Sequence, residues 1–375
     1  MKYNTNLKNL KESKLSIFQN EISKIKDITL LTYGESDYPI DPMIKTEMIH
    51  FLIEDKGKYQ PLKGLEKLRN ALTFKENQKH HRNYSSNNVL ITAGATEGLF
   101  LALSSLINKN DEVLLIKPCY PTYEYILNYL GAKITYVDYD KNFEVDLIDL
   151  KKKIHSKIKV IIFNYPNNPS GSILSEDKVI TIKNLILKYK VPFILDNVYD
   201  EIVYSKYLYL DDFNELDDYR IIINSLSKSK RLSGFRLGYI IGPETLINLC
   251  SKLHQEINIC LPQFMMEGMI YALTSNPEVE YYKKNIAFII KQLNKMKVPY
   301  IIPKGTFYIC INVSNTKMND DEFCYYLANK YKIGLIPCSY FKMDGYARIC
   351  AANSIEKLNT ALKQLKIALK DIKAL

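Results

Sequence analysis

The middle of the chain, from about residue 89 to residue 242, alternates short apolar runs with segments of helical periodicity. The runs are rich in valine and isoleucine and almost continuously apolar, which is typical of strands buried on both faces. We therefore predict seven strands, at Val89–Thr92, Val113–Ile116, Ile134–Val137, Val160–Phe163, Phe193–Leu195, Ile221–Asn224 and Tyr239–Ile241.

Helical patterns separate several of these strands, as at Thr96–Leu106 and Ser175–Tyr189. Strands that alternate with helices form a mainly parallel sheet with helices on both faces. The expected fold is therefore α/β, with a seven-stranded sheet in a large domain.

The remainder of the chain predicts a smaller α+β domain. Its expected elements are a helical pattern at Ile257–Lys297, a turn into a strand at Lys304–Ile309, a strand at Arg348–Ala351 and an amphipathic helix at Ile355–Leu375. We expect residues 46–285 to form the large domain, and residues 1–45 and 286–375 to form the small one.

Polar residues follow five of the predicted strands. They are the run Gly94–Gly98, Tyr120, the run Asn164–Gly171, Asp196, and the pair Ser225 and Lys228. Open α/β sheets bind ligands outside the carboxyl ends of their strands. We therefore expect these five loops to meet at one crevice.

Lys228 gives this crevice a specific chemistry. It ends the run Ser225-Leu226-Ser227-Lys228, and Arg236 follows eight residues later. An amine forms a Schiff base with an aldehyde, and a hydroxyl with a guanidinium can hold a phosphate dianion. A lysine that condenses with a phosphorylated aldehyde indicates pyridoxal 5'-phosphate, PLP.

The other loops have chemical roles that suit this cofactor. Gly94, Ala95 and Thr96 open a helix whose free N–H groups can receive phosphate. Asp196 can pair with a protonated pyridine nitrogen, and Tyr120 can stack on the ring. Each feature has a plainer alternative, namely an ordinary turn or a packed aromatic side chain.

Several runs resemble class I/II aminotransferases, which are fold type I PLP enzymes. Asn164–Gly171 resembles their Asn-Pro-x-Asn-Pro-[Thr/Ser]-Gly run, with Tyr165 between Asn164 and Pro166, and Ser225–Tyr239 resembles their Ser-x-Ser-Lys run with its arginine. Further matches, in family order over most of the chain, are Tyr59–Gly64, Ile91–Leu99, Lys117–Pro121, Leu195–Tyr199 and Tyr346–Arg348.

The resemblance implies a role for each matched residue. Lys228, Asp196 and Tyr199 would be catalytic, with Lys228 carrying the Schiff base. The cofactor would be held by Gly94, Ala95, Thr96, Ser225 and Arg236 at its phosphate, by Asp196 at its pyridine nitrogen, by Asn168 and Tyr199 at its ring oxygen, and by Tyr120 at its ring face. Arg348, Gly34 and Asn168 would bind the substrate carboxylate. Tyr59 would reach the phosphate bound by a partner subunit, which implies a homodimer with shared active sites.

Three positions depart from the family pattern. Cys338 stands where many relatives have glycine, near the substrate side. Lys230 and Arg231 make the loop after Lys228 unusually basic, and Lys230 is a rival nucleophile by residue type. We see no second arginine placed for a side-chain carboxylate, which puts a preference for dicarboxylates in doubt.

Composition excludes other classes of protein. The 375 residues contain 47% hydrophobic and 25% charged residues, as in an ordinary soluble enzyme, and no apolar run is long enough to span a membrane. The net charge is +10, but only six of the 51 basic residues are arginine and the lysines are scattered, so we expect a solvated surface and no nucleic-acid partner.

The seven cysteines lack Cys-x-x-Cys spacing and predict reduced thiols in the cytoplasm. The adjacent His80 and His81 lack the spacing of metal ligands, so we predict no metal and an exposed pair.

The leading hypothesis is an aminotransferase that moves an amino group between an L-amino acid and a 2-oxo acid in a ping-pong cycle. Another PLP enzyme of the same fold would share these motifs, for example a C–S lyase, a decarboxylase or an amino-acid oxidase or cyclase. A PLP-sensing regulator would need a DNA-binding domain, and only about 30 residues precede Leu30–Gly34. A basic scaffold protein would not explain the polar loops at the strand ends.

Overall fold

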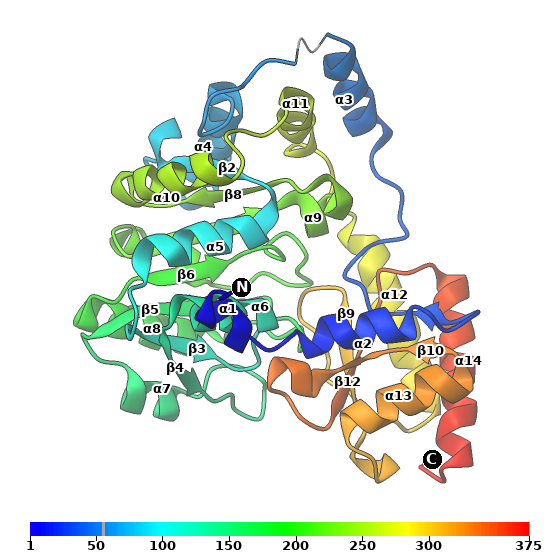
Figure 1. The fold of residues 1–375 in the computed structure, drawn as a ribbon. Helices are drawn as coiled ribbons and strands as arrows, with labels where there is room; N and C mark the ends of the chain where they lie inside the picture. Colours follow the sequence, from blue (N-terminus) through cyan, green and yellow to red (C-terminus); the bar gives the residue numbers. More distant parts are fainter. Residues whose placement is uncertain (55–56, 375) are drawn as a thin grey trace.

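A seven-stranded sheet forms the centre of the larger part of the molecule (Figure 1). The computed structural model describes residues 1–54 and 57–374. The strands in spatial order are β2 (Val89–Thr92), β8 (Gly238–Ile241), β7 (Arg220–Ser225), β6 (Phe193–Asp196), β5 (Ile158–Phe163), β3 (Glu112–Ile116) and β4 (Lys133–Val137). Only β8 runs against its two neighbours; the other pairs are parallel. The predicted α/β fold is confirmed, and each strand lies within two residues of its predicted ends.

The strands are apolar on both faces because helices cover both. On β5, Val160 and Ile162 face one cluster of buried side chains, whereas Ile161 and Phe163 face another. The first cluster includes helices α5 (Gly94–Leu106), α6 (Pro121–Leu130) and α10 (Glu244–Ile257), and the second includes α7 (Leu147–Lys153) and α8 (Glu176–Tyr189). This alternation follows from the two-residue period of a strand.

A further group of helices packs at the β2 end of the sheet. It consists of α3 (Pro42–Glu54), α4 (Glu66–His80) and α11 (Gln263–Ala272). Helix α3 projects farthest from the sheet in Figure 1 and packs on α11. The approach is close, because a Cβ added to Gly268 of α11 would lie 2.4 Å from Cγ of Met48.

A smaller antiparallel sheet lies beside the large one. Its strands are β11 (Ile336–Pro337), β12 (Tyr346–Cys350) and β9 (Tyr308–Asn312), in that order, and its helices are α2 (Lys14–Ile22), α12 (Val279–Lys295), α13 (Asp320–Tyr331) and α14 (Ile355–Asp371). The N-terminal segment adds β1 (Thr29–Leu30), which pairs in parallel with β10 (Ile333–Gly334). Phe18, Ile22 and Leu31 of this segment are buried in the same core as α13 and α14.

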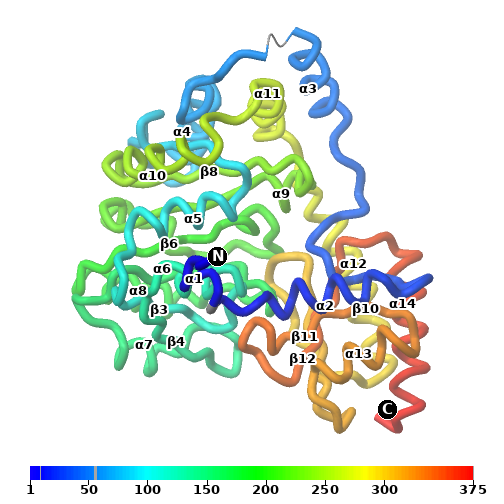
Figure 2. Tube along the Cα trace, viewed as in Figure 1, coloured from blue at the N-terminus to red at the C-terminus, as the bar shows by residue number. Residues whose placement is uncertain are grey.

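The first residues connect the two parts of the molecule. Helix α1 (Thr5–Asn9) lies against α6, and the chain then runs to α2 beside the small sheet (Figure 2). The predicted domain boundary at residues 285 and 286 falls inside α12. The division into 46–285 and the two flanking segments stays a prediction.

The helical pattern predicted over residues 257–297 is present, but two breaks divide it. The structure ends α10 at Ile257 and places α11 and α12 after it, with breaks at 258–262 and 273–278. Each break contains a proline, Pro262 and Pro277, which lacks the N–H that a helix interior needs. The two predicted C-terminal strands are present but begin elsewhere, at Tyr308 and Tyr346, and α14 ends at Asp371.

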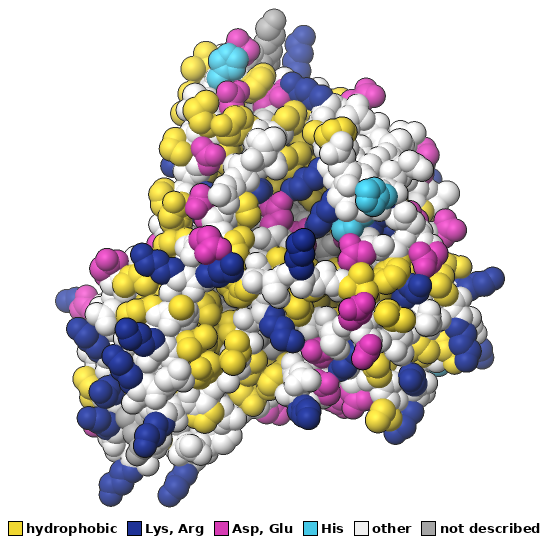
Figure 3. Space-filling view, turned by 180° about the vertical axis from the view of Figure 1, so that it is seen from behind, with side chains coloured by type: hydrophobic (Ala, Val, Ile, Leu, Met, Phe, Trp, Pro, Cys, Tyr) yellow, Lys and Arg dark blue, Asp and Glu magenta, His cyan; other side chains and the backbone are white. Residues whose placement is uncertain are grey.

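Basic and acidic side chains are interspersed over most of the rear face of the molecule (Figure 3). In the part of the chain that the structure describes, no helix combines the length and the apolar character needed to cross a bilayer.

Candidate active site

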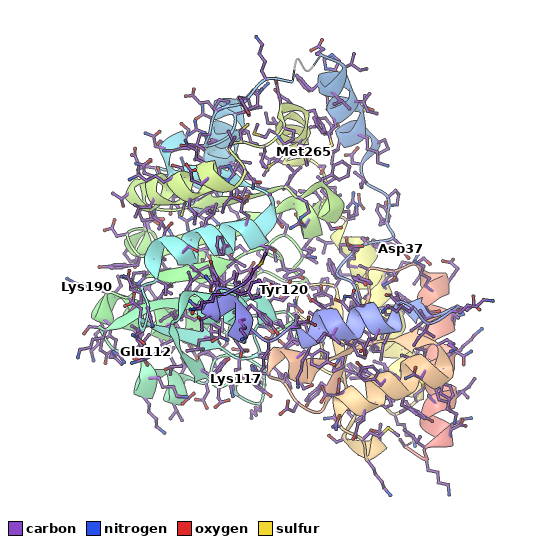
Figure 4. The ribbon with its side chains drawn as sticks, in the orientation of Figure 1. Asp37, Glu112, Lys117, Tyr120, Lys190 and Met265 are labelled. Atoms are coloured by element: carbon purple, nitrogen blue, oxygen red, sulfur yellow. The ribbon has the colours of Figure 1, made fainter. Side chains whose placement is uncertain are left out.

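A cavity of about 310 Å³ lies at the carboxyl ends of the large sheet, where the small sheet and α2 approach it. Tyr120, which follows β3, lies near the middle of the molecule between these parts (Figure 4). Eleven of the predicted site residues line the cavity: Gly34, Ala95, Thr96, Tyr120, Asn168, Asp196, Tyr199, Ser225, Lys228, Arg236 and Arg348. The expected convergence of the loops is therefore what the structure shows.

Lys228 lies on the short helix α9 (Leu226–Ser229), directly after β7. The side chain of Ser225 caps this helix by accepting a hydrogen bond from the N–H of Ser227 at 3.4 Å. Lys228 Nζ donates to the carbonyl oxygen of Gly34 at 2.9 Å. Burial by the surrounding protein atoms lowers the pKa of this amine to about 8. About a tenth of the amine is therefore neutral and nucleophilic at pH 7, far more than for an unperturbed lysine with a pKa near 10.5.

Asp196 is a buried carboxyl group at the end of β6. The hydroxyl of Tyr123 donates to Oδ2 at 2.5 Å, and the N–H of Val198 donates to Oδ1 at 3.4 Å. Burial raises the pKa of Asp196 to about 6. No ion pair of Asp196 occurs within the described ranges, so a cation brought into the cavity would stabilise its charged form.

Arg236 and the start of α5 form one end of the cavity. Arg236 Nη1 donates to the carbonyl oxygen of Ser233 at 2.9 Å. Gly94 has a φ of +81°, and a Cβ at this position would lie 2.5 Å from Arg236 Nη2, so glycine is required there. Ala95 and Thr96 follow in the first turn, where N–H groups have no partner within the helix. Thr96 and Arg236 are exposed, so this end is open to solvent in the single chain.

Arg348 forms the opposite wall, from the middle strand of the small sheet. Its Nη1 donates to Oδ1 of Asn168 and its Nη2 to the carbonyl oxygen of Thr32, both at 2.7 Å. The guanidinium carbon lies 4.1 Å from the centre of the Tyr308 ring. The buried Nε has no hydrogen-bond partner among the described residues. A carboxylate is the ligand that best matches such a guanidinium.

Two tyrosines lie between Lys228 and Arg348. The hydroxyl groups of Tyr199 and Tyr308 are 2.9 Å apart. A Cβ on Gly34 would lie 2.2 Å from the Tyr308 oxygen and 3.0 Å from Lys228 Nζ, so the absence of a side chain at Gly34 lets both groups approach the backbone closely. The backbone of Gly34 and these two hydroxyls therefore face one small volume.

Two predicted residues do not line the cavity. Gly94 lies behind Arg236, where it permits the close approach described above. Tyr59 is 81% exposed and does not line this cavity. Its predicted contact is with the cofactor of a partner subunit. Neither placement tests the predicted role.

Tyr123, Tyr308 and Asn164 contribute to the site in ways that were not predicted from the sequence. Asn164 Nδ2 donates to the carbonyl oxygen of Asp196 at 3.0 Å, and its Oδ1 accepts from the N–H of Asn168 at 3.1 Å. Asn164 opens the polar run after β5, and Tyr123 lies one helical turn after Tyr120, so both carried a local signal. Leu15 and Gln19 of α2 also line the cavity, and no local sequence signal indicated this.

The remaining candidates lie outside the cavity. Lys230 is 1% exposed and its amine pairs with Glu201, so it does not face the cavity with Lys228. Cys338 is buried, with its Sγ 3.6 Å from Sγ of Cys310. The prediction of an exposed histidine pair was wrong for His80, which is buried, with its Nδ1 3.0 Å from Asp212 Oδ1.

These groups fit PLP. The cavity offers a reactive amine, a buried carboxyl group that lacks a cation, and a guanidinium beside an open helix start. A mainly parallel seven-stranded sheet with this set of groups at its strand ends defines a PLP-dependent enzyme of fold type I.

Comparison with known proteins gives the family. The aminotransferase class I and II family matches residues 26–365. An aspartate aminotransferase of Pyrococcus horikoshii is 31% identical over 372 residues, covering 96% of this chain and 95% of the relative. A probable N-acetyl-LL-diaminopimelate aminotransferase of Bacillus subtilis is 28% identical over 359 residues, covering 93% and 91%.

The fold agrees with this match. A crystal structure of an aspartate aminotransferase from Thermotoga maritima superposes with a TM-score of 0.93 at 28% sequence identity, covering 98% of this chain and 100% of that one. The chain belongs to the class I and II aminotransferase family. It is a PLP-dependent aminotransferase, and the other PLP reactions considered above are not favoured.

Proposed function

We propose that Lys228 is the residue that binds PLP covalently and that the cavity around it is the site of amino-group transfer. The observation that carries this proposal is the position of a lysine amine of lowered pKa, at about 8, in a cavity whose walls include Asp196, Arg236 and Arg348. PLP, when bound, supplies an aldehyde carbon that joins to amines and a ring that withdraws electrons from the substrate Cα. The chain's own residues bind, orient and move protons.

At the cofactor ring, Asp196 would hold a proton on the pyridine nitrogen. Its buried carboxylate has a hydroxyl donor, Tyr123, but no cation of its own, which suits a protonated nitrogen. Tyr199 and Asn168 would donate to the ring oxygen, and Tyr120 would cover one face of the ring. All of these residues except Tyr123 carry the roles that the resemblance implied.

The phosphate would lie between Arg236, the hydroxyl of Ser225 and the N–H groups at the start of α5. Arg236 supplies a charge-assisted donor, and Ala95 and Thr96 supply N–H groups at the positive end of the helix. Gly94 allows the guanidinium to approach the helix start.

The substrate carboxylate would bind to Arg348 and Asn168, with the backbone of Gly34 beside it. Asn168 Oδ1 already accepts from Nη1, which fixes the direction of the guanidinium. Lys228, as a free amine beside the substrate, would take the proton from the substrate Cα and hold it for return to the reacting group. Gly34 borders the space between Lys228 and Tyr308 in which this transfer would occur.

The active unit would be a homodimer. Tyr59 is 81% exposed, as a residue that reaches into a partner would be in a single chain, and the Arg236 end of the cavity is open. Helix α3 also exposes apolar side chains, with Ile49 at 57%, Leu52 at 53% and Ile53 at 79% exposed. Apolar side chains are visible over this projecting region in Figure 3. A second copy of the chain would bury them.

The side chain of the amino donor remains to be assigned. The cations that line the cavity, among the described residues, are Lys228, Arg236 and Arg348, and each already has a role in this proposal. A second carboxylate would therefore need a cation from elsewhere, such as the partner. The two relatives named above act on different substrates by their names, so a panel of amino acids is the direct test. We place the enzyme in the cytoplasm, in keeping with seven free cysteines.

Lys228→Ala tests the proposal. Borohydride reduction of the PLP-loaded protein, followed by peptide mapping, should place the label on Lys228, and the variant should lose both the label and turnover. Lys230→Ala is the comparison, because Lys230 is the rival lysine two residues away. A label on Lys230 in the unmodified protein would contradict the assignment.

A further inference from the structure

Two basic residues, two and three positions after the reactive lysine, are buried rather than exposed. Lys230 is 1% exposed and Arg231 is 7% exposed. Buried cations are rare unless each has a partner of opposite charge or several oxygen acceptors. The partners of these two side chains therefore indicate which parts of the structure the basic pair connects.

Lys230 joins three separate segments. Its Nζ lies 3.0 Å from Oε2 of Glu201 and donates to the carbonyl oxygen of Ser275 at 2.6 Å. The other oxygen of Glu201 pairs with Lys75 of α4. Burial alone would raise the pKa of Glu201, but the charges of Lys230 and Lys75 outweigh it and lower the pKa to about 2, so Glu201 stays ionised.

Glu201 follows Tyr199 by two residues in the loop after β6. The ion pair therefore ties the segment that carries Asp196 and Tyr199 to the segment that carries Lys228.

Arg231 makes the corresponding connection to the N-terminal segment. Its Nε donates to the carbonyl oxygen of Pro39 at 3.0 Å, and its Nη1 to that of Asn276 at 3.5 Å. The guanidinium also lies 5.1 Å from the ring centre of Tyr38. Pro39 is five residues after Gly34, whose carbonyl oxygen accepts from Lys228 Nζ.

The short helix α9 needs such support. It has only four residues, too few to be stable through its own hydrogen bonds. In its proposed role Lys228 must nevertheless reach both the cofactor and the substrate Cα, and a displacement of about 1 Å in a catalytic group can cost on the order of 100-fold in rate.

We propose that Lys230 and Arg231 are positioning residues for Lys228, which hold α9 between the segment of Tyr199 and the segment of Gly34. This proposal rests on the proposed role of Lys228. It assigns a function to the two basic residues by which this loop departs from the family pattern. Neither residue contacts the cavity; both act through the backbone of the lysine loop.

Lys230→Met is the main test, because methionine has a similar length and Glu201 keeps Lys75 as a partner. Lys178→Met is the matched control. Lys178 is also a largely buried lysine, with Asp140 Oδ2 at 2.7 Å and the carbonyl oxygen of Val145 at 2.5 Å, but it lies on α8, away from the cavity. Each holoenzyme is measured for thermal stability, for kcat and KM separately, and for the pH midpoint of its PLP absorbance.

We expect both variants to lose thermal stability, and only Lys230→Met to lose kcat, by about 10- to 100-fold. We also expect only Lys230→Met to shift the absorbance midpoint, by about half a pH unit or more, because the surroundings of Lys228 change. Lys230→Arg, which keeps the charge, should restore part of kcat. Equal kcat and midpoints in Lys230→Met and Lys178→Met would overturn the proposal.

If Lys230→Met does not fold, Arg231→Lys is the second test. Lysine keeps the positive charge but cannot donate to the carbonyl groups of both Pro39 and Asn276 as the planar guanidinium does. The variant should lower kcat and shift the midpoint in the same way, and an unchanged kcat and midpoint would overturn the proposal. Peptide mapping after borohydride reduction distinguishes failure of the proposed Lys228 role from failure of the positioning role alone. A label on a residue other than Lys228 would remove the proposed function itself, whereas a label on Lys228 with unchanged kinetics would remove only the positioning role.

Discussion

The hydroxyl of Tyr123 donates a hydrogen bond of 2.5 Å to Oδ2 of Asp196, across 73 residues of sequence. Tyr123 is on α6 and Asp196 ends β6, so the contact joins a helix on one face of the large sheet to the end of a central strand. This bond lowers the pKa of Asp196 against the larger effect of burial, which raises it to about 6. Among the described residues no cation pairs directly with this carboxyl group, so it is available to a cation brought into the cavity.

Asp196→Asn should lower kcat by about 10- to 100-fold, because an amide cannot stabilise a proton on the pyridine nitrogen as a carboxylate does. Thermal stability should change little, since the amide retains one acceptor oxygen for Tyr123. Tyr123→Phe is the comparison and should cost less, because the carboxylate remains. Steady-state kinetics with a saturating amino acid is the measurement, and a normal kcat in Asp196→Asn would remove this residue from the mechanism.

The rate at which the PLP-free protein takes up PLP should rise with pH and level off near pH 8. The reason is that burial lowers the pKa of Lys228 to about 8, so that the reactive neutral amine predominates above this pH and declines tenfold per unit below it. Stopped-flow absorbance at several pH values measures the rate. The control is a free lysine derivative, whose rate should keep rising to about pH 10; the same profile in the protein would show that the amine is unperturbed.

Arg348→Ala should keep PLP bound and lose amino-acid affinity. Removal of a charge-assisted pair to the carboxylate costs on the order of 2–4 kcal/mol in kcat/KM. The absorbance spectrum of the holoenzyme reports PLP, and kinetics across several amino acids reports the substrate. Arg348→Lys should restore only part of the loss, because a lysine cannot bond Asn168, Thr32 and a carboxylate from one planar fork. An unchanged kcat/KM in Arg348→Ala would exclude the proposed orientation of the substrate.

The protein should sediment as a dimer, and Ile53→Asp should weaken that dimer, because this side chain of α3 is 79% exposed in the single chain. Ile367→Asp is a control, because it changes another exposed isoleucine on α14, a helix that lies well apart from α3 (Figure 1). Sedimentation velocity at working concentration measures both. Fully active monomers of the unmodified protein would contradict shared active sites.

The large sheet could be predicted from the sequence because its strands are buried on both faces and are therefore apolar throughout. The meeting of Asp196, Lys228 and Asn168 could be predicted for the same reason, since parallel strands direct their carboxyl ends to one edge. The breaks around α11 were missed because the apolar pattern continues across Pro262 and Pro277, although the two prolines carried the signal.

Contacts between distant segments could not be predicted from local patterns. Tyr308 meets Tyr199 across 109 residues, and Arg231 meets Pro39 across 192. From local sequence, Lys230 and Arg231 read as exposed basic residues. Only the tertiary structure shows that both are buried and contact oxygen atoms of distant segments. The same holds for Leu15 and Gln19, which reach the cavity because the N-terminal segment returns to the small sheet.

The groups proposed to hold the cofactor of the same chain lie between Gly94 and Arg236, whereas Arg348 and Gly34, proposed for the substrate, come from the two ends of the chain. The hydrophobic cores beneath these two sets are different clusters of side chains. Damage to the small-sheet core, for example at Leu358 of α14, would therefore leave a yellow, PLP-loaded protein that no longer recognises amino acids. With the proposed roles, the colour of bound PLP would report only the residues of the large-sheet side of the site, and a preparation judged by its colour alone would be credited with more activity than it has.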